Sequence, residues 1–305
     1  MFLNAISTKT TILSKMFKLA LNPSKTQLEP VFLEINKNEV ASVHQQLIPK
    51  VIWMYWDDEN IPGVVSLCYE QTKKICEGYD ILLLNKKTVL EFITLPDFNP
   101  ILPKAIVADY IRLKLLEKFG GIWVDASVFI TEDFDWFITK LGSHQAFLFY
   151  SDECTIDIKK PISENWFIAA PKGSKFIKEW FDEFSRCITS EQPLNFYSEL
   201  KKDKKLLQNL SKPDYLLCYI SAIVVLEKFP FPILYASSGS VGHYFTYKHN
   251  FNSYLIATEL LLCNKNDVSK PKLIKMTAGT RNVIDFFLRY KLFLSTSLLG
   301  SEMNK

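Results

Sequence analysis

The sequence lacks any long apolar run. No stretch of its 305 residues approaches the roughly 18 consecutive apolar residues that a membrane-crossing helix needs. The first 21 residues, MFLNAISTKTTILSKMFKLAL, also lack the long apolar core and the small-residue cleavage site of a signal peptide. We therefore expect a cytoplasmic protein.

Paired cysteines and a strong charge of either sign are missing as well. The six cysteines are scattered, without a CxxC pair or a zinc-like spacing, so we expect free thiols in a reducing compartment. The 36 basic and 33 acidic residues leave a formal net charge of +3. This charge is too small to indicate a nucleic-acid partner, and we expect none.

The sequence is instead rich in apolar and aromatic residues. Hydrophobic residues make up 48% of the chain, aromatic residues 14% and charged residues 23%. This composition excludes a disordered chain and supports a sizeable core. Because no linker is long enough to separate domains, we expect one main domain at residues 48–282, with extensions at 1–47 and 283–305.

Both extensions have an amphipathic character. Residues 1–21 mix apolar side chains with lysines, which predicts a basic helix that is interrupted near Asn22 and Pro23. The tail after residue 282 is apolar and aromatic, with two basic residues. Each extension fits either a helix packed on the main domain or a helix lying on a membrane surface, and both interpretations are open.

The main domain alternates strand and helix patterns. We predict strands at 51–56, 80–85, 122–124, 146–151 and 166–171, helices at 64–79, 104–119, 175–188 and 213–229, and a loop at 237–250. The helix at 104–119 is followed by two glycines, which is a C-cap signal. This order of elements predicts an α/β fold with a mostly parallel central sheet.

Three charged residues fall within 17 positions. Asp125 follows the predicted strand at 122–124, and open α/β sheets bind ligands at the carboxyl ends of their strands. Asp109 and Arg112 are three residues apart and share one face of a helix. Taken singly, these features fit a capping Asp and a solvated ion pair. Together, with a Gly-Gly turn between them, they favour a ligand site.

At these residues the sequence resembles a known family. IPKVIWMYW, followed by ADYIRLKLLEKFGGIWVDASVF, is similar to the capsular polysaccharide synthesis glycosyltransferases. This family belongs with the wider glycosyltransferases that carry a DxD sugar-binding region, including yeast-type α-mannosyltransferases and the clostridial glucosylating toxins. The resemblance covers about residues 49–275 and implies a GT-A-type nucleotide-sugar-binding fold, here with added helices at both ends.

The resemblance also implies an activity. The enzyme would move a hexose-type sugar from a nucleotide-sugar donor to a hydroxyl of a growing capsular or lipopolysaccharide glycan, with retention of the anomeric configuration. Its acceptor would be a glycan or glycolipid. Its place would be the inner face of a bacterial cytoplasmic membrane, with peripheral membrane contact.

Individual residues receive roles from the same resemblance. Trp56 would lie near the donor base, because an aromatic ring offers a face to a base. Asp109 and Arg112 would contact the hydroxyls of the donor sugar, since charged groups form strong, directional hydrogen bonds. Asp125 would be the first Asp of the DxD motif, in contact with the sugar or ribose and the metal shell. Gly121 would belong to the substrate-binding turn.

Ser127 departs from the family motif. The usual second Asp at this position ligates Mn²⁺ or Mg²⁺, which bridges the diphosphate. A neutral serine leaves metal dependence open, because it offers a weak oxygen or holds a metal-bound water. Without a metal, cationic side chains and backbone N–H groups would have to stabilise the negative charge of the diphosphate. Ser127 also leaves open a different class of protein, a non-catalytic protein that binds a nucleotide-sugar or a carbohydrate.

Four further candidates have an ordinary structural alternative each. By the resemblance, Lys272 and Lys275 would lie near the phosphates, although lysines also occur on solvated strands. Asn165 matches a family position near the donor sugar, or it forms a turn. His243 fits a loop metal ligand, since imidazole suits such ions, or it is a loop residue without a ligand.

Overall fold

The structure is a computed structural model that describes residues 2–37 and 47–303. The strands are β1 (Phe32–Ile35), β2 (Val51–Tyr55), β3 (Asp80–Leu84), β4 (Gly121–Val124), β5 (Val128–Ile130), β6 (Ala146–Tyr150), β7 (Ser163–Ala170), β8 (Ile233–Ser237) and β9 (Leu273–Lys275). The α-helices are α1 (Phe2–Leu21), α2 (Gly63–Ile75), α3 (Lys104–Phe119), α4 (Asp135–Leu141), α5 (Lys175–Ile188), α6 (Lys204–Leu207), α7 (Leu217–Lys228), α8 (Tyr244–Lys248), α9 (Ser253–Leu262) and α10 (Ala278–Arg289).

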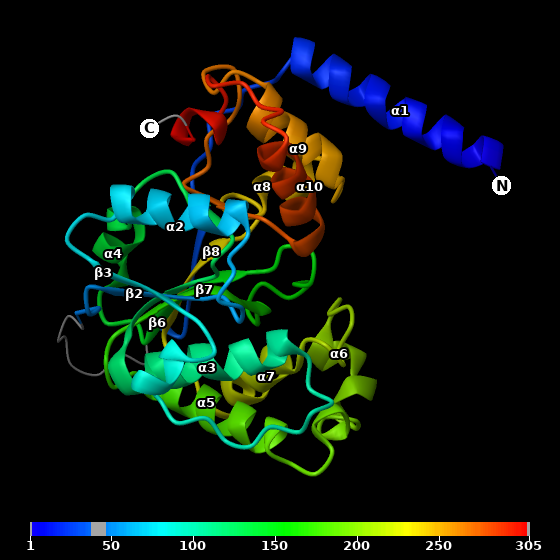
Figure 1. The fold of residues 1–305 in the computed structure, drawn as a ribbon. Coiled ribbons are helices and arrows are strands. Elements are labelled where there is room, and N and C mark those ends of the chain that lie inside the picture. The colour runs from blue at the N-terminus through cyan, green and yellow to red at the C-terminus, as the bar shows by residue number, and fades with distance from the viewer. Residues whose placement is uncertain (1, 38–46, 304–305) are drawn as a thin grey trace.

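A seven-stranded sheet lies between two layers of helices (Figure 1). One core contains residues of α2, α4, α9 and α10, and the other contains residues of α3, α5 and α7. Alternate residues of β2 enter opposite cores, because side chains alternate along a strand. Ile52 and Met54 belong to the first core, and Trp53 and Tyr55 to the second.

The sheet is mixed, with the strand order β1-β8-β6-β7-β4-β2-β3. β2 pairs parallel with β3 and β4, and β6 pairs parallel with β8, whereas β7 is antiparallel to β4 and β6, and β1 is antiparallel to β8. Five of the seven strands therefore run in one direction. The predicted α/β class with a mostly parallel sheet is confirmed, and β7 and β1 are the two exceptions.

Most of the predicted elements are present. The predicted strands at 51–56, 80–85, 122–124, 146–151 and 166–171 overlap β2, β3, β4, β6 and β7, and the predicted helices overlap α2, α3, α5 and α7. The predicted loop at 237–250 is wrong in part, because it contains α8. β5 and β9 were not predicted, since three residues are too few for strand alternation to show.

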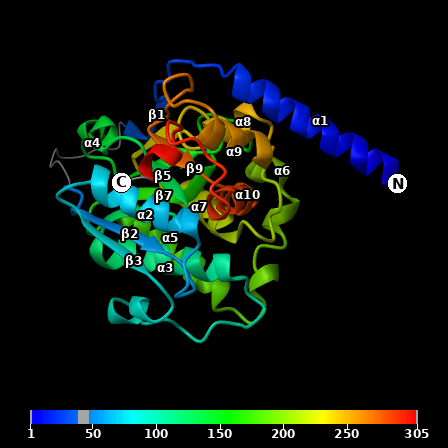
Figure 2. The same ribbon diagram turned by 45° about the horizontal axis from the view of Figure 1, so that its top comes forward.

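The N-terminal extension contributes to the sheet as well as forming a helix. β1 lies within residues 1–47 and pairs with β8, so the sheet does not begin at residue 48. α1 ends at Leu21, beside the predicted interruption, and projects away from the rest of the molecule (Figures 1 and 2). Along its described length, Met16 and Leu19 pack on the core, whereas Leu13 and Phe17 are exposed.

The C-terminal helix is packed on the main domain. α10 buries Ile284, Phe287 and Leu288 and contacts α2 and α9. None of the helices in residues 2–37 and 47–303 is both long and apolar enough to cross a bilayer. Contact of either extension with a membrane surface stays a prediction.

The turn between α3 and β4 depends on two glycines. Gly120 and Gly121 have φ angles of +67° and +97°, which side chains disfavour. A Cβ atom on Gly121 would stand 2.5 Å from Cγ1 and 2.7 Å from the carbonyl oxygen of Val51. The close approach of β4 to β2 therefore requires glycine at this position.

We predict that Gly121→Ala costs about 3 kcal/mol of unfolding free energy, because it combines backbone strain with overpacking. Gly78→Ala is the matched control, since Gly78 has a φ of +84° and nothing lies within 4 Å of its added Cβ. The control should cost about 1 kcal/mol, from strain alone. Denaturant unfolding of both variants measures the difference, and equal costs would contradict the close-packing argument.

Candidate active site

Three of the predicted site residues, Trp56, Asp125 and Asn165, lie at one edge of the sheet. Trp56 follows β2 and Asp125 follows β4, and the parallel pairing of these strands places their carboxyl ends side by side. β7 runs antiparallel to β4, so its first residues, including Asn165, lie at the same edge. The backbone N–H of Asp125 donates to the carbonyl of Trp166 at 2.9 Å. Open α/β sheets bind their ligands at this edge.

Arg112 joins the two carboxylates of the site. Its Nη1 donates to Oδ1 of Asp109 at 2.6 Å, and its Nη2 donates to Oδ1 of Asp125 at 2.7 Å. Its guanidinium carbon lies 4.8 Å from the ring centroid of Trp123, and the side chain of Arg112 is only 5% exposed. Trp123 Nε1 also donates to Oδ1 of Asp125 at 2.9 Å. A planar guanidinium that is both stacked and paired on two sides is held in one orientation.

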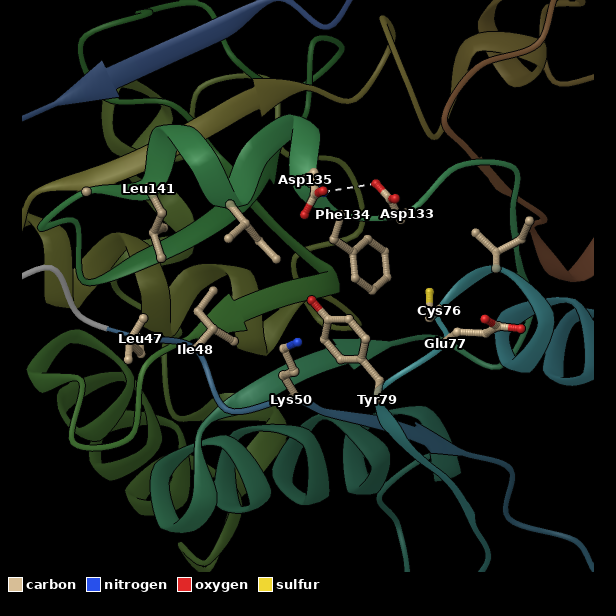
Figure 3. A pocket seen from close by; sticks show the side chains of 13 residues that line it. Leu47, Ile48, Lys50, Cys76, Glu77, Tyr79, Asp133, Phe134, Asp135 and Leu141 are labelled. Atoms are coloured by element: carbon tan, nitrogen blue, oxygen red, sulfur yellow. Dashed lines mark hydrogen bonds between the residues drawn. The ribbon is translucent and has the colours of Figure 1, made fainter.

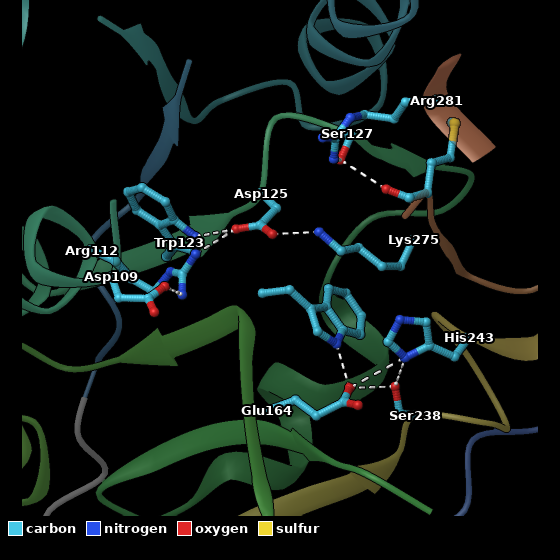
Figure 4. Close-up of polar contacts among 12 residues, drawn as sticks. Asp109, Arg112, Trp123, Asp125, Ser127, Glu164, Ser238, His243, Lys275 and Arg281 are labelled. Carbon is cyan, nitrogen blue, oxygen red and sulfur yellow. Dashed lines mark hydrogen bonds and ion pairs between the residues drawn. The ribbon is translucent and has the colours of Figure 1, made fainter. Parts of the chain in front are cut away.

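Lys275 reaches Asp125 from a distant part of the chain. β9 pairs antiparallel with β5, and their register places Lys275 opposite Val128. The backbone N–H of Lys275 donates to the carbonyl of Gly242 at 2.8 Å, which holds the strand in place. The Nζ of Lys275 donates to Oδ2 of Asp125 (Figure 4). Both carboxylate oxygens of Asp125 are therefore paired with cations.

Ser127, two residues after Asp125, is buried. Its Oγ donates to the carbonyl of Met276 at 3.1 Å and accepts from Nη1 of Arg281 at 3.2 Å. The guanidinium carbon of Arg281 lies 5.3 Å from the ring centroid of Trp56. Sequence reasoning did not select Arg281, and its position six residues after Lys275 was the only available signal.

The two carboxylates have pKa values shifted in opposite directions. Burial alone would raise the pKa of Asp125, but the charges of Lys275 and Arg112 outweigh it and lower that pKa from 3.8 to about 2. Burial raises the pKa of Asp109 from 3.8 to about 6, against the opposing charge of Arg112. Asp125 is therefore an anion throughout the neutral range, whereas Asp109 changes its charge near pH 6.

Asn165 lies within β7, beside Asp109. Its side chain hydrogen-bonds to Asp109, and this bond favours the ionised carboxylate. Asn165 lies within β7 and is 8% exposed, so the alternative of a turn-forming Asn is wrong. Its contact with the donor sugar stays a prediction.

His243 belongs to a neighbouring network instead of the Asp125 cluster. Its Nδ1 lies 2.7 Å from Oγ of Ser238 and 3.4 Å from Oε2 of Glu164. Ser238 Oγ and Trp166 Nε1 both donate to the same Glu164 oxygen (Figure 4). Sequence reasoning missed Glu164, although it directly precedes Asn165. These contacts engage Nδ1 of His243, and its role as a metal ligand stays a prediction.

Two other candidates lie apart from the cluster. Lys272 forms a salt bridge with Glu132 at 2.7 Å, and that carboxylate is 56% exposed. Gly121 begins β4, at the opposite end of this strand from Asp125. The structure does not bring either residue to Asp109 and Arg112, and their roles in substrate binding stay predictions.

A cavity of about 410 Å³ opens elsewhere, at the amino-terminal edge of the same strands (Figure 3). Lys50 and Tyr79, which line it, directly precede β2 and β3. Asp133 and Asp135 line its other side, at the start of α4. None of the predicted site residues lines this cavity.

The residues of the cluster do not fit a resident Mn²⁺ or Mg²⁺ ion. Such ions bind several oxygen ligands, but both carboxylate oxygens of Asp125 already accept hydrogen bonds from cations. The Oγ of Ser127 is engaged with a carbonyl and with Arg281. Within the described ranges, no group of three His, Cys, Asp or Glu side chains could hold a metal ion.

The geometry defines an α/β protein with a buried cluster of charged residues at the carboxyl edge of its sheet. The chain belongs to the family described as "Capsular polysaccharide synthesis protein", whose sequence profile matches residues 6–197. The match contains Trp56, Asp109, Arg112 and Asp125, and the resemblance noted in the sequence is therefore confirmed.

Two curated relatives are glycosyltransferases by name. "Inositol phosphoceramide mannosyltransferase 1" of Schizosaccharomyces pombe (strain 972 / ATCC 24843) is 25% identical over 183 residues, which are 53% of this chain and 54% of that protein. "O-glycosyltransferase braB" of Annulohypoxylon truncatum is 34% identical over 83 residues, which are 26% of this chain and 19% of that protein. The chain thus spans about half the length of the first relative and a fifth of the second.

Two solved structures are also similar. The PaToxG glycosyltransferase has a TM-score of 0.37 at 15% identity, with 99% of this chain and 94% of that chain covered. The apo-form glycosyltransferase GlyE of Streptococcus pneumoniae TIGR4 has a TM-score of 0.39 at 14% identity, with 85% and 64% covered.

We predict that Asp125→Asn and Asp109→Asn have different effects on stability. The lowered pKa of Asp125 means that its charge stabilises the fold above pH 3.8, and this contribution is lost as the pH falls toward 2. The raised pKa of Asp109 means that its ionisation costs stability as the pH rises from 3.8 to 6.

At pH 7.5, Asp125→Asn should therefore lower the unfolding free energy by about 2 kcal/mol, whereas Asp109→Asn should leave it unchanged or raise it. Denaturant unfolding of the two variants beside the wild type measures both values. A greater loss in Asp109→Asn than in Asp125→Asn would contradict the assigned charges.

Proposed function

We propose that this protein is a GT-A-type glycosyltransferase that moves a hexose-type sugar from a nucleotide-sugar donor to a hydroxyl of a growing capsular or lipopolysaccharide glycan. The observation that carries the proposal is the buried fork of Arg112 between Asp109 and Asp125. This fork lies at the ligand-binding edge of the sheet. Family membership and the names of the two curated relatives support the same class of reaction.

The fork suits a polyhydroxylated ring. Carboxylates accept hydrogen bonds from sugar hydroxyls, and Arg112 keeps both carboxylates in a fixed orientation before the ligand arrives. Asn165 adds an amide beside Asp109, which both donates and accepts. Together these groups would hold the donor sugar in one position and leave its anomeric carbon to face the acceptor.

The aromatic side of the site suits the nucleotide. Trp56 follows β2 and is partly exposed, so its ring is available beside the charged cluster.

In the transfer, the bond between the anomeric carbon and the diphosphate oxygen breaks, and its electron pair stays on the diphosphate. The acceptor oxygen bonds to the anomeric carbon, and its proton passes to the departing diphosphate. We expect retention of the anomeric configuration, as the family resemblance implies.

Donor binding should weaken as the pH falls through about 6. Asp109 has a pKa of about 6, so below this pH it becomes protonated and loses its negative charge toward the sugar and Arg112. Asp125, with a pKa of about 2, stays ionised over the same range. Calorimetric titration with a nucleotide-sugar between pH 5 and pH 8 measures the effect. Asp109→Asn should bind weakly throughout and lack the inflection, and an inflection that persists in this variant would contradict the assignment.

The decisive test of the function is a donor screen. Purified protein would be incubated with UDP-, GDP-, ADP- and CMP-sugars, with and without Mn²⁺ and with added glycan acceptors, and nucleotide release would be measured. We expect release from one donor and a loss of at least about 100-fold in Asp125→Asn, because the charged contact to the sugar is removed. Asp182→Asn is the matched control, since Asp182 is an exposed carboxylate on α5, paired with Lys178.

Each outcome of the screen has a clear meaning. Release that survives in Asp182→Asn and disappears in Asp125→Asn would support the transferase. Donor binding without release, even with acceptors, would favour the alternative of a non-catalytic nucleotide-sugar-binding protein. The absence of both binding and release would contradict the proposed function.

A further inference from the structure

The cluster around Asp125 contains more positive than negative charge. Among the described residues, Arg112, Lys275 and Arg281 face two carboxylates, those of Asp109 and Asp125. Arg112 is paired with both carboxylates and Lys275 with one. Arg281 forms no salt bridge with any carboxylate in residues 2–37 and 47–303, and its polar contact is the neutral hydroxyl of Ser127. One positive charge at the edge of the site therefore lacks a negative partner.

Arg281 is held in place without being neutralised. Its guanidinium lies over the ring of Trp56, 5.3 Å from the centroid, and Nη1 donates to Ser127 at 3.2 Å. Burial lowers the pKa of Arg281, and the charge of Asp125 opposes that shift. The remaining donors of the planar fork stay available, because guanidinium carries five N–H groups. Such a fork matches two oxygens of a phosphate group.

Ser127 explains why the charge of Arg281 is unpaired at this position. A second Asp at this position would pair with Arg281 directly and remove its unpaired charge. The serine hydroxyl instead accepts one hydrogen bond from Arg281 and donates its own proton to the carbonyl of Met276. The same substitution thus removes a metal ligand and leaves an arginine free to bind an anion.

We propose that Arg281 and Lys275 form a metal-free site for the diphosphate of the donor, with Arg281 replacing the charge of a divalent cation. This inference rests on the proposed function, because the diphosphate is that of the nucleotide-sugar. Lys275 is tied to Asp125 and defines one side of the site. Arg281 supplies the unpaired charge on the other side, beside the ring of Trp56, where the nucleotide is expected. The departing diphosphate gains its negative charge between these two cations.

The probe for this site is inorganic pyrophosphate, because its binding does not depend on the identity of the base or sugar. Isothermal titration calorimetry would be performed on the full chain in EDTA and again in MnCl₂. We expect pyrophosphate to bind in EDTA, with no gain in affinity from Mn²⁺. Arg281→Gln should weaken binding by about tenfold or more, because a charge-assisted fork is lost.

Arg289→Gln is the matched control, since Arg289 lies on the same helix α10 and its side chain is 72% exposed. This variant should bind as the wild type does. Arg281→Lys keeps the charge but loses the planar fork, so its affinity should fall between those of the wild type and Arg281→Gln. Circular dichroism and thermal unfolding check that each variant is folded. The wild-type titrations in EDTA and in MnCl₂ test the metal dependence of pyrophosphate binding even if a variant fails to fold.

Two results would overturn the inference. The first is binding of pyrophosphate only with Mn²⁺, or no binding at all. The second is equal affinity for pyrophosphate in Arg281→Gln and the wild type.

Titration with UDP, GDP and ADP in the same buffers separates this inference from the proposed function. A nucleoside diphosphate that binds only with Mn²⁺ would contradict the metal-free site and leave the transferase intact. Pyrophosphate binding that depends on Arg281, with no nucleotide bound, would support the anion site and contradict the nucleotide-sugar donor.

Discussion

The ion pairs of Arg112 with Asp109 and Asp125 are the interaction on which the rest of the site depends. Removing these charges from water is costly, and an unpaired buried charge would be more costly still. The guanidinium offsets this cost by using both ends of its fork and by lying on the ring of Trp123. Since each partner restricts the others, helix α3 and the end of β4 are held in one relative position.

The sheet supplies the frame for this arrangement. The parallel strands β2 and β4 end at one edge, and the antiparallel β7 begins there, so three segments distant in sequence meet around Asp125. The short antiparallel strands β5 and β9 then bring Lys275 to the same edge of the sheet, next to Asp125. Gly121 allows β4 to lie close to Val51 in β2, which keeps the carboxyl ends of both strands adjacent.

The balance of burial and charge differs between the two sides of the site. Near Asp109 the burial of a carboxylate dominates and raises its pKa, whereas near Lys275 the cations dominate and lower the pKa of Asp125. Around Arg281 no carboxylate of the described part of the chain forms a salt bridge with the guanidinium. This gradient suits a ligand that has a neutral, hydroxyl-rich part at one end and an anionic part at the other.

The sequence by itself determined the α/β class, most strands and helices, and the Asp109, Arg112 and Asp125 constellation, because periodicity, the Gly-Gly turn and a short motif are local signals. Only the tertiary structure decided which distant groups join them. The contact of Lys275 with Asp125 spans 150 residues, and Arg281 carried no motif. The structure also separated Lys272 and His243 from the cluster by giving each another partner. Such choices follow from strand register and charge pairing in three dimensions, which no local pattern of residues encodes.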